Sequence, residues 1–284
     1  MPTKNINPIV VKILAIVFVS CTFLGQQAHA GAWPVRPGKV LVSLTGSYFK
    51  ASRLWDRKGK SSAYADSGSF NSKGLYLYSE IGASRVFTVI VSVPYVSNTY
   101  SDTRGKSTQS SFGDAEVGGR VYLANINFKF YFAIQGTVIV PLYSDSPTQN
   151  VGYQSLGTDL RLVGSGSGSL GGDKSCYYTI EIGGRQYATG NGPFQLRSTV
   201  SYGINLDKKD QLAFSGSGVL SQSSDKAFRG NLSQNKDFSY VQASISAGRS
   251  FTKNFSVFLA YNQFVVGRNT GIGSNVSLSL INKF

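Results

Sequence analysis

Histidine, cysteine and methionine are almost absent from this sequence, whose 284 residues include one His, two Cys and one Met. A Ser-His-Asp hydrolase needs a histidine as its general base, and protein zinc sites are built mainly from His and Cys. The single histidine, His29, lies in a segment that we expect to be removed. We therefore expect no catalytic residues, no metal site, no cofactor and no enzyme activity.

The N-terminus has the pattern of a secretory signal. Lys4 and Lys12 flank the start of an apolar run, Ile9–Leu24, and the small-residue pattern Ala28-His29-Ala30 follows it. A short apolar run that ends in a small-x-small site is typical of a cleaved signal peptide. We expect residues 1–30 to be removed and one domain, residues 31–284, to start at Gly31.

A second interpretation of this segment stays open, because Val19-Ser20-Cys21 loosely fits the lipid-attachment motif of a lipoprotein. Phe18 fits that motif poorly. Cleavage after residue 30 would leave Cys176 as the one thiol. No internal disulfide could then form.

Long apolar runs are missing after Leu24, and no later stretch approaches the roughly 20 apolar residues of a membrane helix. Glycine and aromatic residues are plentiful instead, with 32 Gly, 18 Phe and 16 Tyr. This composition disfavours a helical bundle and favours many short strands.

From Val40 onward, apolar and polar residues alternate. Near the C-terminus, Val276, Leu278 and Leu280 share one face, while Ser277 and Ser279 share the other. Alternation with a period of two predicts a sheet with one apolar and one polar face.

About twelve such stretches occur, the even number typical of a bacterial outer-membrane barrel. We expect strands near 39–50, 72–83, 86–98, 113–124, 128–142, 158–169, 175–188, 194–206, 210–221, 238–249, 254–266 and 272–284. Short links near 84–85, 125–126, 172–174, 207–209 and 252–253 alternate with longer polar segments, such as 51–71, 99–112, 143–157 and 222–237. Short periplasmic turns and longer extracellular loops are typical of these barrels. The prediction is therefore an all-β fold, a single antiparallel up-and-down transmembrane β-barrel in the outer membrane of a Gram-negative bacterium.

A soluble sandwich or lipocalin-like barrel is the competing interpretation, because its strands alternate in the same way with the apolar face turned inward. Aromatic residues near predicted strand ends favour the membrane barrel, since aromatic belts lie at membrane interfaces. These belt candidates are Tyr48, Tyr95, Tyr122, Tyr202 and Tyr261.

The charged residues within the predicted strands share the polar phase. A charge on the lipid face near the midplane would cost about 2–4 kcal/mol, so this placement is consistent with a membrane barrel. The candidates for lining the lumen are five acids and five bases: Glu80, Asp114, Glu116, Asp159 and Glu181, with Arg120, Lys129, Arg161, Arg185 and Arg197.

Two interpretations of this charged set stay open. The side chains can pair across a narrow lumen and brace it, or they can line an open pore. Asp114 and Glu116, two residues apart on one face, could also hold a cation or share a proton.

The excess of basic over acidic residues, 28 against 14, lies mainly in loops, turns and termini. The first long loop carries Arg53, Arg57, Lys58 and Lys60. Such a loop could contact anionic lipopolysaccharide, attract anionic solutes or simply stay solvated. No basic helix or aromatic recognition motif supports a nucleic-acid partner.

Residues Phe112 to Leu123, which read FGDAEVGGRVYL, and the preceding Pro94-Tyr95 resemble the meta-pathway phenol-degradation-like family of outer-membrane proteins. The match covers mainly residues 86–124. The resemblance implies a barrel of about this size that passes small, often apolar or aromatic, molecules across the outer membrane. Gly31-Ala32-Trp33 looks like the start of some related barrels associated with exopolysaccharide, which leaves the cargo open.

The C-terminal Phe284, with Leu280 and Leu278, resembles the signal that barrel-assembly machinery reads, although Asn282 departs from its alternation. The partners we expect are outer-membrane lipid, lipopolysaccharide, that machinery and a small solute. The expected function is a small-solute channel or transporter, with a non-transporting barrel for membrane integrity or surface contact as the alternative.

Overall fold

The computed structural model describes residues 31–143, 151–172, 174–229 and 231–284. In this part of the chain the strands are β1 (Val40–Trp55), β2 (Ser61–Ala63), β3 (Ser69–Gly82), β4 (Phe87–Asp102), β5 (Gly105–Phe112), β6 (Asp114–Ile126), β7 (Phe130–Pro141), β8 (Gly157–Gly171), β9 (Lys174–Tyr187), β10 (Phe194–Asn205), β11 (Asp210–Gln222), β12 (Phe238–Ser250), β13 (Phe255–Arg268) and β14 (Thr270–Lys283). Two single turns of 3-10 helix, η1 (Ala65–Ser67) and η2 (Leu232–Gln234), lie in the connections. No helix among the described residues is long and apolar enough to cross a membrane.

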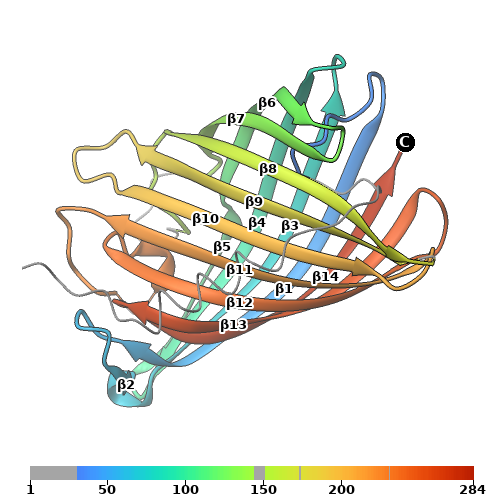
Figure 1. Ribbon diagram of the computed structural model, residues 1–284. Coiled ribbons are helices and arrows are strands. Elements are labelled where there is room, and N and C mark those ends of the chain that lie inside the picture. The colour runs from blue at the N-terminus through green and yellow to red at the C-terminus, as the bar shows by residue number, and fades with distance from the viewer. Residues whose placement is uncertain (1–30, 144–150, 173, 230) are drawn as a thin grey trace, which may run out of the picture.

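Twelve of these strands form a closed antiparallel barrel (Figure 1). Successive strands pair with each other around the ring, and β1 pairs with β14 from Leu41 opposite Lys283 to Trp55 opposite Thr270. This last pairing closes the ring, so no strand edge of the wall is left unpaired, as a membrane barrel requires. The predicted fold, a single up-and-down barrel of about twelve strands, is confirmed.

The predicted strand ranges match the barrel strands closely, but two long connections contain strands that were predicted as loops. The segment 99–112 includes β5, which pairs with the end of β4 from Tyr95 opposite Phe112 to Asp102 opposite Gly105. The segment 51–71 includes the end of β1 and the short β2. Ser, Thr and Gln predominate in β5, so it lacks the apolar face by which the other strands were recognised.

The hairpin of β4 and β5 leaves the wall at Pro94 and Gly113. Up to Ser92, β4 pairs with β6, and from Tyr95 it pairs with β5. Gly113 donates its N–H to the carbonyl oxygen of Pro94 at 2.8 Å and accepts a hydrogen bond from Leu142. The Pro-Tyr and Gly-Asp pairs in the family-like sequence therefore lie together at this branch point.

The burial pattern is the reverse of that of a soluble barrel. Apolar side chains on the outer face are exposed, among them Leu77 at 46%, Leu160 at 59% and Leu278 at 48%. Charged side chains on the inner face are buried, with Glu80 at 1% and Asp159 at 3%. An apolar outer band around a polar interior is the arrangement of transmembrane barrels, so the soluble interpretation is wrong.

The aromatic belt was predicted correctly in part. Tyr48, Tyr95 and Tyr261 are exposed on the outer face. Tyr122 is an exception, because its ring lies 6.0 Å from that of Tyr131 on the inner wall. Tyr122 follows Arg120 by two residues in regular pairing with β7 and shares its inward phase, so its assignment to the outer face was wrong.

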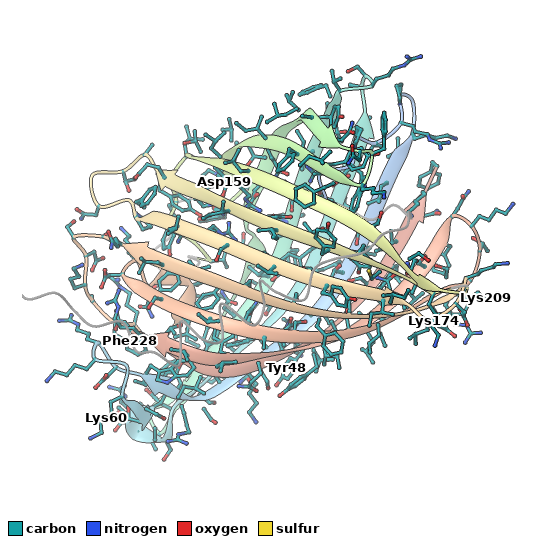
Figure 2. The ribbon with its side chains drawn as sticks, viewed as in Figure 1. Tyr48, Lys60, Asp159, Lys174, Lys209 and Phe228 are labelled. Atoms are coloured by element: carbon teal, nitrogen blue, oxygen red, sulfur yellow. The ribbon has the colours of Figure 1, made fainter. Side chains whose placement is uncertain are left out.

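The two ends of the barrel differ. Lys174 and Lys209 mark the end that carries short turns, and Lys60 and Phe228 mark the opposite end, where the long connections lie (Figure 2). Short turns face the periplasm in outer-membrane barrels, and long loops face outward. We refer to these as the turn end and the loop end.

The alternation predicts how neighbouring substitutions in the middle of β14 affect stability. Leu278→Arg places a charge on the lipid face and should lower the free energy of unfolding by about 2–4 kcal/mol. Ser277→Arg places the same charge on the inner face and should change it by less than about 1 kcal/mol. Urea unfolding in lipid vesicles measures both, and equal losses would contradict the orientation of this strand.

Candidate functional site in the barrel lumen

The first ion pair of the inner wall joins β3 and β6. Arg120 Nη1 lies 3.0 Å from Glu80 Oε1, and the guanidinium also donates to Gln135 Oε1 on β7. Tyr78 donates its hydroxyl hydrogen to Glu80 Oε1 at 2.6 Å. Because both charged groups are more than nine-tenths buried, each needs the other to offset its lost hydration.

The second and larger cluster centres on Asp159 of β8, which is labelled in Figure 2. Its carboxylate lies 2.6 Å from Arg161 Nε, 2.9 Å from Arg185 Nε and 3.7 Å from Arg197 Nη1. Glu116 of β6 pairs with Arg185 and lies 3.8 Å from Arg161. Glu181 of β9 lies 3.7 Å from Arg161. Three acids and three arginines from four strands are thus linked in one network.

Asp114 lies outside the ion pairs and is bound by tyrosines instead. Tyr143 donates to Asp114 Oδ1 at 2.9 Å, and the Tyr187 hydroxyl lies 3.4 Å from Oδ2. Glu116 turns to Arg185 rather than to Asp114. Across the described ranges, no group of three or more acidic, His or Cys side chains is placed to hold a metal ion.

A missing side chain makes room for the larger cluster. A Cβ atom on Gly183 would lie 2.5 Å from Arg161 Cγ and would also meet the backbone of β8. The glycine therefore lets the Arg161 stem pass flat over the inner wall toward Asp159.

Lys129 does not belong to this wall. It is an exposed residue of the turn between β6 and β7, and its assignment to the lumen is wrong. The two residues before it, Asn127 and Phe128, have positive φ angles of 51° and 54°. Alternation holds only for extended backbone. Lys129 still lies in this turn, one residue before β7 begins, so the phase of Tyr131 and Ala133 does not extend back to it.

Residues 31–33 lie inside the barrel, which was not predicted from the sequence. Ala32 is fully buried and donates its N–H to Ser165 Oγ at 2.8 Å. Arg120 Nη1 donates to the carbonyl oxygen of Gly31 at 2.7 Å. The Trp33 ring lies 6.2 Å from that of Tyr131. These partners belong to the inner faces of β6, β7 and β8, so residues 31–33 narrow the lumen beside the charged wall.

The opposite wall is aromatic. In the half of the barrel toward the loop end, a cavity of about 380 Å³ is lined by strands β1, β3, β4 and β12–β14, by η2 and by Val151. The Phe49 and Phe264 rings lie 5.3 Å apart, and the Tyr240 ring stacks on Phe264 at 4.5 Å. The cavity is also lined by Phe70, Phe238, Asn98, Gln242 and Asn275.

Sequence reasoning did not single out this aromatic wall, although a signal for it was present. Phe49 has the phase of Ser43, Thr45 and Ser47 rather than that of Leu44 and Tyr48. An aromatic residue in the polar phase of a barrel strand points into the lumen. Asn275 adds a polar group here, because its Oδ1 atom is buried and has no hydrogen-bond partner among the described residues.

The predicted basic loop lies at the loop end. Arg53 lies near the C-terminal end of β1. The turn from β1 to β2 and its flank carry the other three basic residues, which are exposed: Arg57, Lys58 and Lys60. Asp56 Oδ1 accepts hydrogen bonds from the backbone N–H groups of Lys60 and Lys58, both at 2.8 Å. The hydrogen bond from Lys60 is the main cause that lowers the pKa of Asp56, so this carboxylate is ionised at neutral pH.

No protein-family model matches the sequence, and no curated protein matches it. Among solved structures, the chain is similar to the COG4313 outer membrane channel from Pseudomonas putida F1, with a TM-score of 0.66 at 12% identity, over 91% of this chain and 100% of that chain. It is also similar to the beta domain of the Bordetella autotransporter BrkA, with a TM-score of 0.51 at 10% identity, over 87% of this chain and 100% of that chain.

These similarities establish that the chain has the fold of outer-membrane β-barrels, the fold of the channel among them. The resemblance to the meta-pathway phenol-degradation-like family is matched by no family model. One of the two similar structures is a channel and the other is part of an autotransporter. Since one fold serves both, function has to be argued from the site.

The pair of Glu80 and Arg120 can be tested with a double-mutant cycle. Glu80→Gln should lower the free energy of unfolding by about 3 kcal/mol, because Arg120 then stays buried without its counter-ion. Adding Arg120→Met to the Glu80→Gln variant should lower the free energy of unfolding much less than Arg120→Met lowers it in the native protein. Urea unfolding measures the cycle, and Asp210→Asn, which removes the exposed pair with Arg249, serves as a control that should leave the midpoint unchanged. Additive effects of the two substitutions would contradict the pairing.

Proposed function

We propose that the protein is an outer-membrane channel for small solutes, and that these solutes are small apolar or aromatic molecules that bind on the aromatic wall. The observation that carries the proposal is the cavity of about 380 Å³ beside Phe49, Tyr240 and Phe264. Ligand pockets for small molecules are about 300–1,000 Å³, mostly apolar, with a few polar groups.

The rings lie where a barrel lumen is ordinarily polar. Phe49 contacts Phe70 and Phe264, with ring centroids 6.1 and 5.3 Å apart. Offset or tilted ring contacts are favourable for aromatic partners, so a planar solute gains similar contacts on the exposed parts of this wall. Gln242 and Asn275 supply hydrogen-bonding groups beside the rings.

The charged wall gives the other half of the lumen a different property. Its arginines and acids are held in pairs, so few charges are free to bind ionic solutes. A neutral solute therefore loses less hydration free energy than an ion when it contacts the aromatic side. On the other side it meets a hydrated surface whose positive and negative charges balance. The similarity to an outer membrane channel and the family-like sequence around Asp114 support a transport role.

A non-transporting barrel remains the second candidate, and one observation favours it. Residues 31–33 and the ion pairs fill part of the lumen, and a barrel filled in this way could serve membrane integrity or surface contact. The two candidates differ in whether ions pass through the barrel.

Planar-bilayer recordings test the proposal, because the native barrel should carry a small, steady ion current. Phenyl glucoside should block this current at lower concentration than methyl glucoside, since only the former carries a ring. Phe49→Ala should raise the half-blocking concentration of phenyl glucoside about tenfold, which corresponds to about 1.4 kcal/mol of ring contact.

Tyr48→Ala is the matched control, because Tyr48 is adjacent in sequence but points outward. It should leave the half-blocking concentration unchanged. Absence of ion current through the native barrel, together with no solute uptake restored to a deletion strain, would contradict the channel. Equal block by both glucosides would contradict the aromatic solute class.

A further inference from the structure

The outer surface of the barrel carries a groove at the loop end that no part of the channel proposal uses. We call it the outer groove. It has a volume of about 600 Å³ and crosses the lipid-facing sides of β10–β13. Its floor is formed by Leu196, Leu220, Val241 and Val266, which are between 40% and 61% exposed. A bilayer would cover these side chains with acyl chains.

Basic side chains lie at one end of the outer groove. Arg57, Lys58 and Arg268 line it together with the apolar floor. The turn that holds Arg57 and Lys58 is held by two contacts, one to the β13–β14 connection and one to the β11–β12 connection. Asn269 donates its N–H to the Asp56 carbonyl oxygen at 2.9 Å, and Arg57 Nη2 donates to the Lys226 carbonyl oxygen at 2.6 Å.

The acidic residues nearby do not neutralise all of this charge. Asp237 pairs with Arg268 at 2.7 Å and with Lys226 at 2.8 Å. Burial would raise the pKa of Asp237, but hydrogen bonds from Arg268 and Lys226 outweigh it, and the pKa is lowered. Asp56 accepts from its own turn. Neither Arg57 nor Lys58 takes part in an ion pair among the described residues.

An apolar floor that ends in unpaired basic groups fits a molecule with acyl chains and a phosphate. The loop end faces the outer leaflet, where the acylated lipid is the phosphorylated glucosamine disaccharide that anchors lipopolysaccharide. We propose that the outer groove binds this lipid anchor, with a phosphate on Arg57 and Lys58 and acyl chains along Leu196, Leu220, Val241 and Val266. Each basic group near an anionic lipid surface is worth about 1 kcal/mol.

The test is titration of the detergent-purified full barrel with lipid A, the isolated anchor, followed by native mass spectrometry. Lipid A should bind the native protein with one-to-one stoichiometry. Arg57→Ser combined with Lys58→Ser should weaken binding about 30-fold, from the loss of two charges. Dephosphorylated lipid A and the phosphorylated disaccharide without acyl chains should both bind more weakly than lipid A.

Lys208→Ser combined with Lys209→Ser is the matched control, since it removes two exposed lysines at the turn end. It should leave the affinity unchanged. The proposal is overturned if the Arg57 and Lys58 variant binds lipid A as tightly as the native protein, if the control loses as much affinity, or if phosphatidylglycerol binds as tightly as lipid A. Ion current is measured on the Arg57 and Lys58 variant and should be unchanged. The lipid A result therefore tests the outer groove independently of the channel.

Discussion

Carboxylates and guanidinium groups can be buried inside this barrel because each offsets the cost of taking the other out of water. That cost is several kcal/mol for each ion in a real protein, even after the surroundings relax. Asp159 has three arginines within 4 Å, and Glu80 has Arg120. These pairs link β3 to β6 across β4, β6 to β8 and β9 across β7, and β8 to β10 across β9, and so brace one half of the wall from within.

This pairing also determines what the lumen can do. The charged side chains of one wall form ion pairs with each other and hydrogen bonds with Tyr78, Tyr143 and Tyr187. We therefore expect them to contribute little to solute binding. The opposite side has rings and amides in place of charges. Residues 31–33 lie against the charged side, whereas the cavity that we propose for the solute lies on the aromatic side.

The sequence predicted the barrel wall well, because the physical rule that governs it is local. An extended strand alternates its side chains, and a lipid-facing charge is costly, so Leu160 and Arg161 can be assigned to opposite faces without a structure. The same rule does not extend to the turn that contains Lys129, where the backbone is not extended. It was misapplied at Tyr122, which shares the inward phase of Arg120. It failed for β5 for another reason, since a hairpin in water needs no apolar face.

The site was less predictable than the wall. Phase analysis identified nine of the buried or half-buried charges, but their partners come from strands far apart in sequence, such as Glu116 and Arg185. The contact between Ala32 and Ser165 joins residues 133 positions apart, and no local pattern encodes it. Phe49 is an intermediate case. Its phase predicts that the side chain points into the lumen, but nothing in the sequence predicts the cavity that it lines.

The orientation of alternate residues is the central claim, and collision measurements on spin labels test it most directly. Single cysteines at Ser277, Leu278, Ser279 and Leu280, in a Cys176→Ser background and in lipid vesicles, would each carry one label. Labels at 278 and 280 should collide with lipid-dissolved oxygen, whereas labels at 277 and 279 should collide with a water-soluble nickel complex. The reverse pattern, or no alternation along β14, would contradict this orientation.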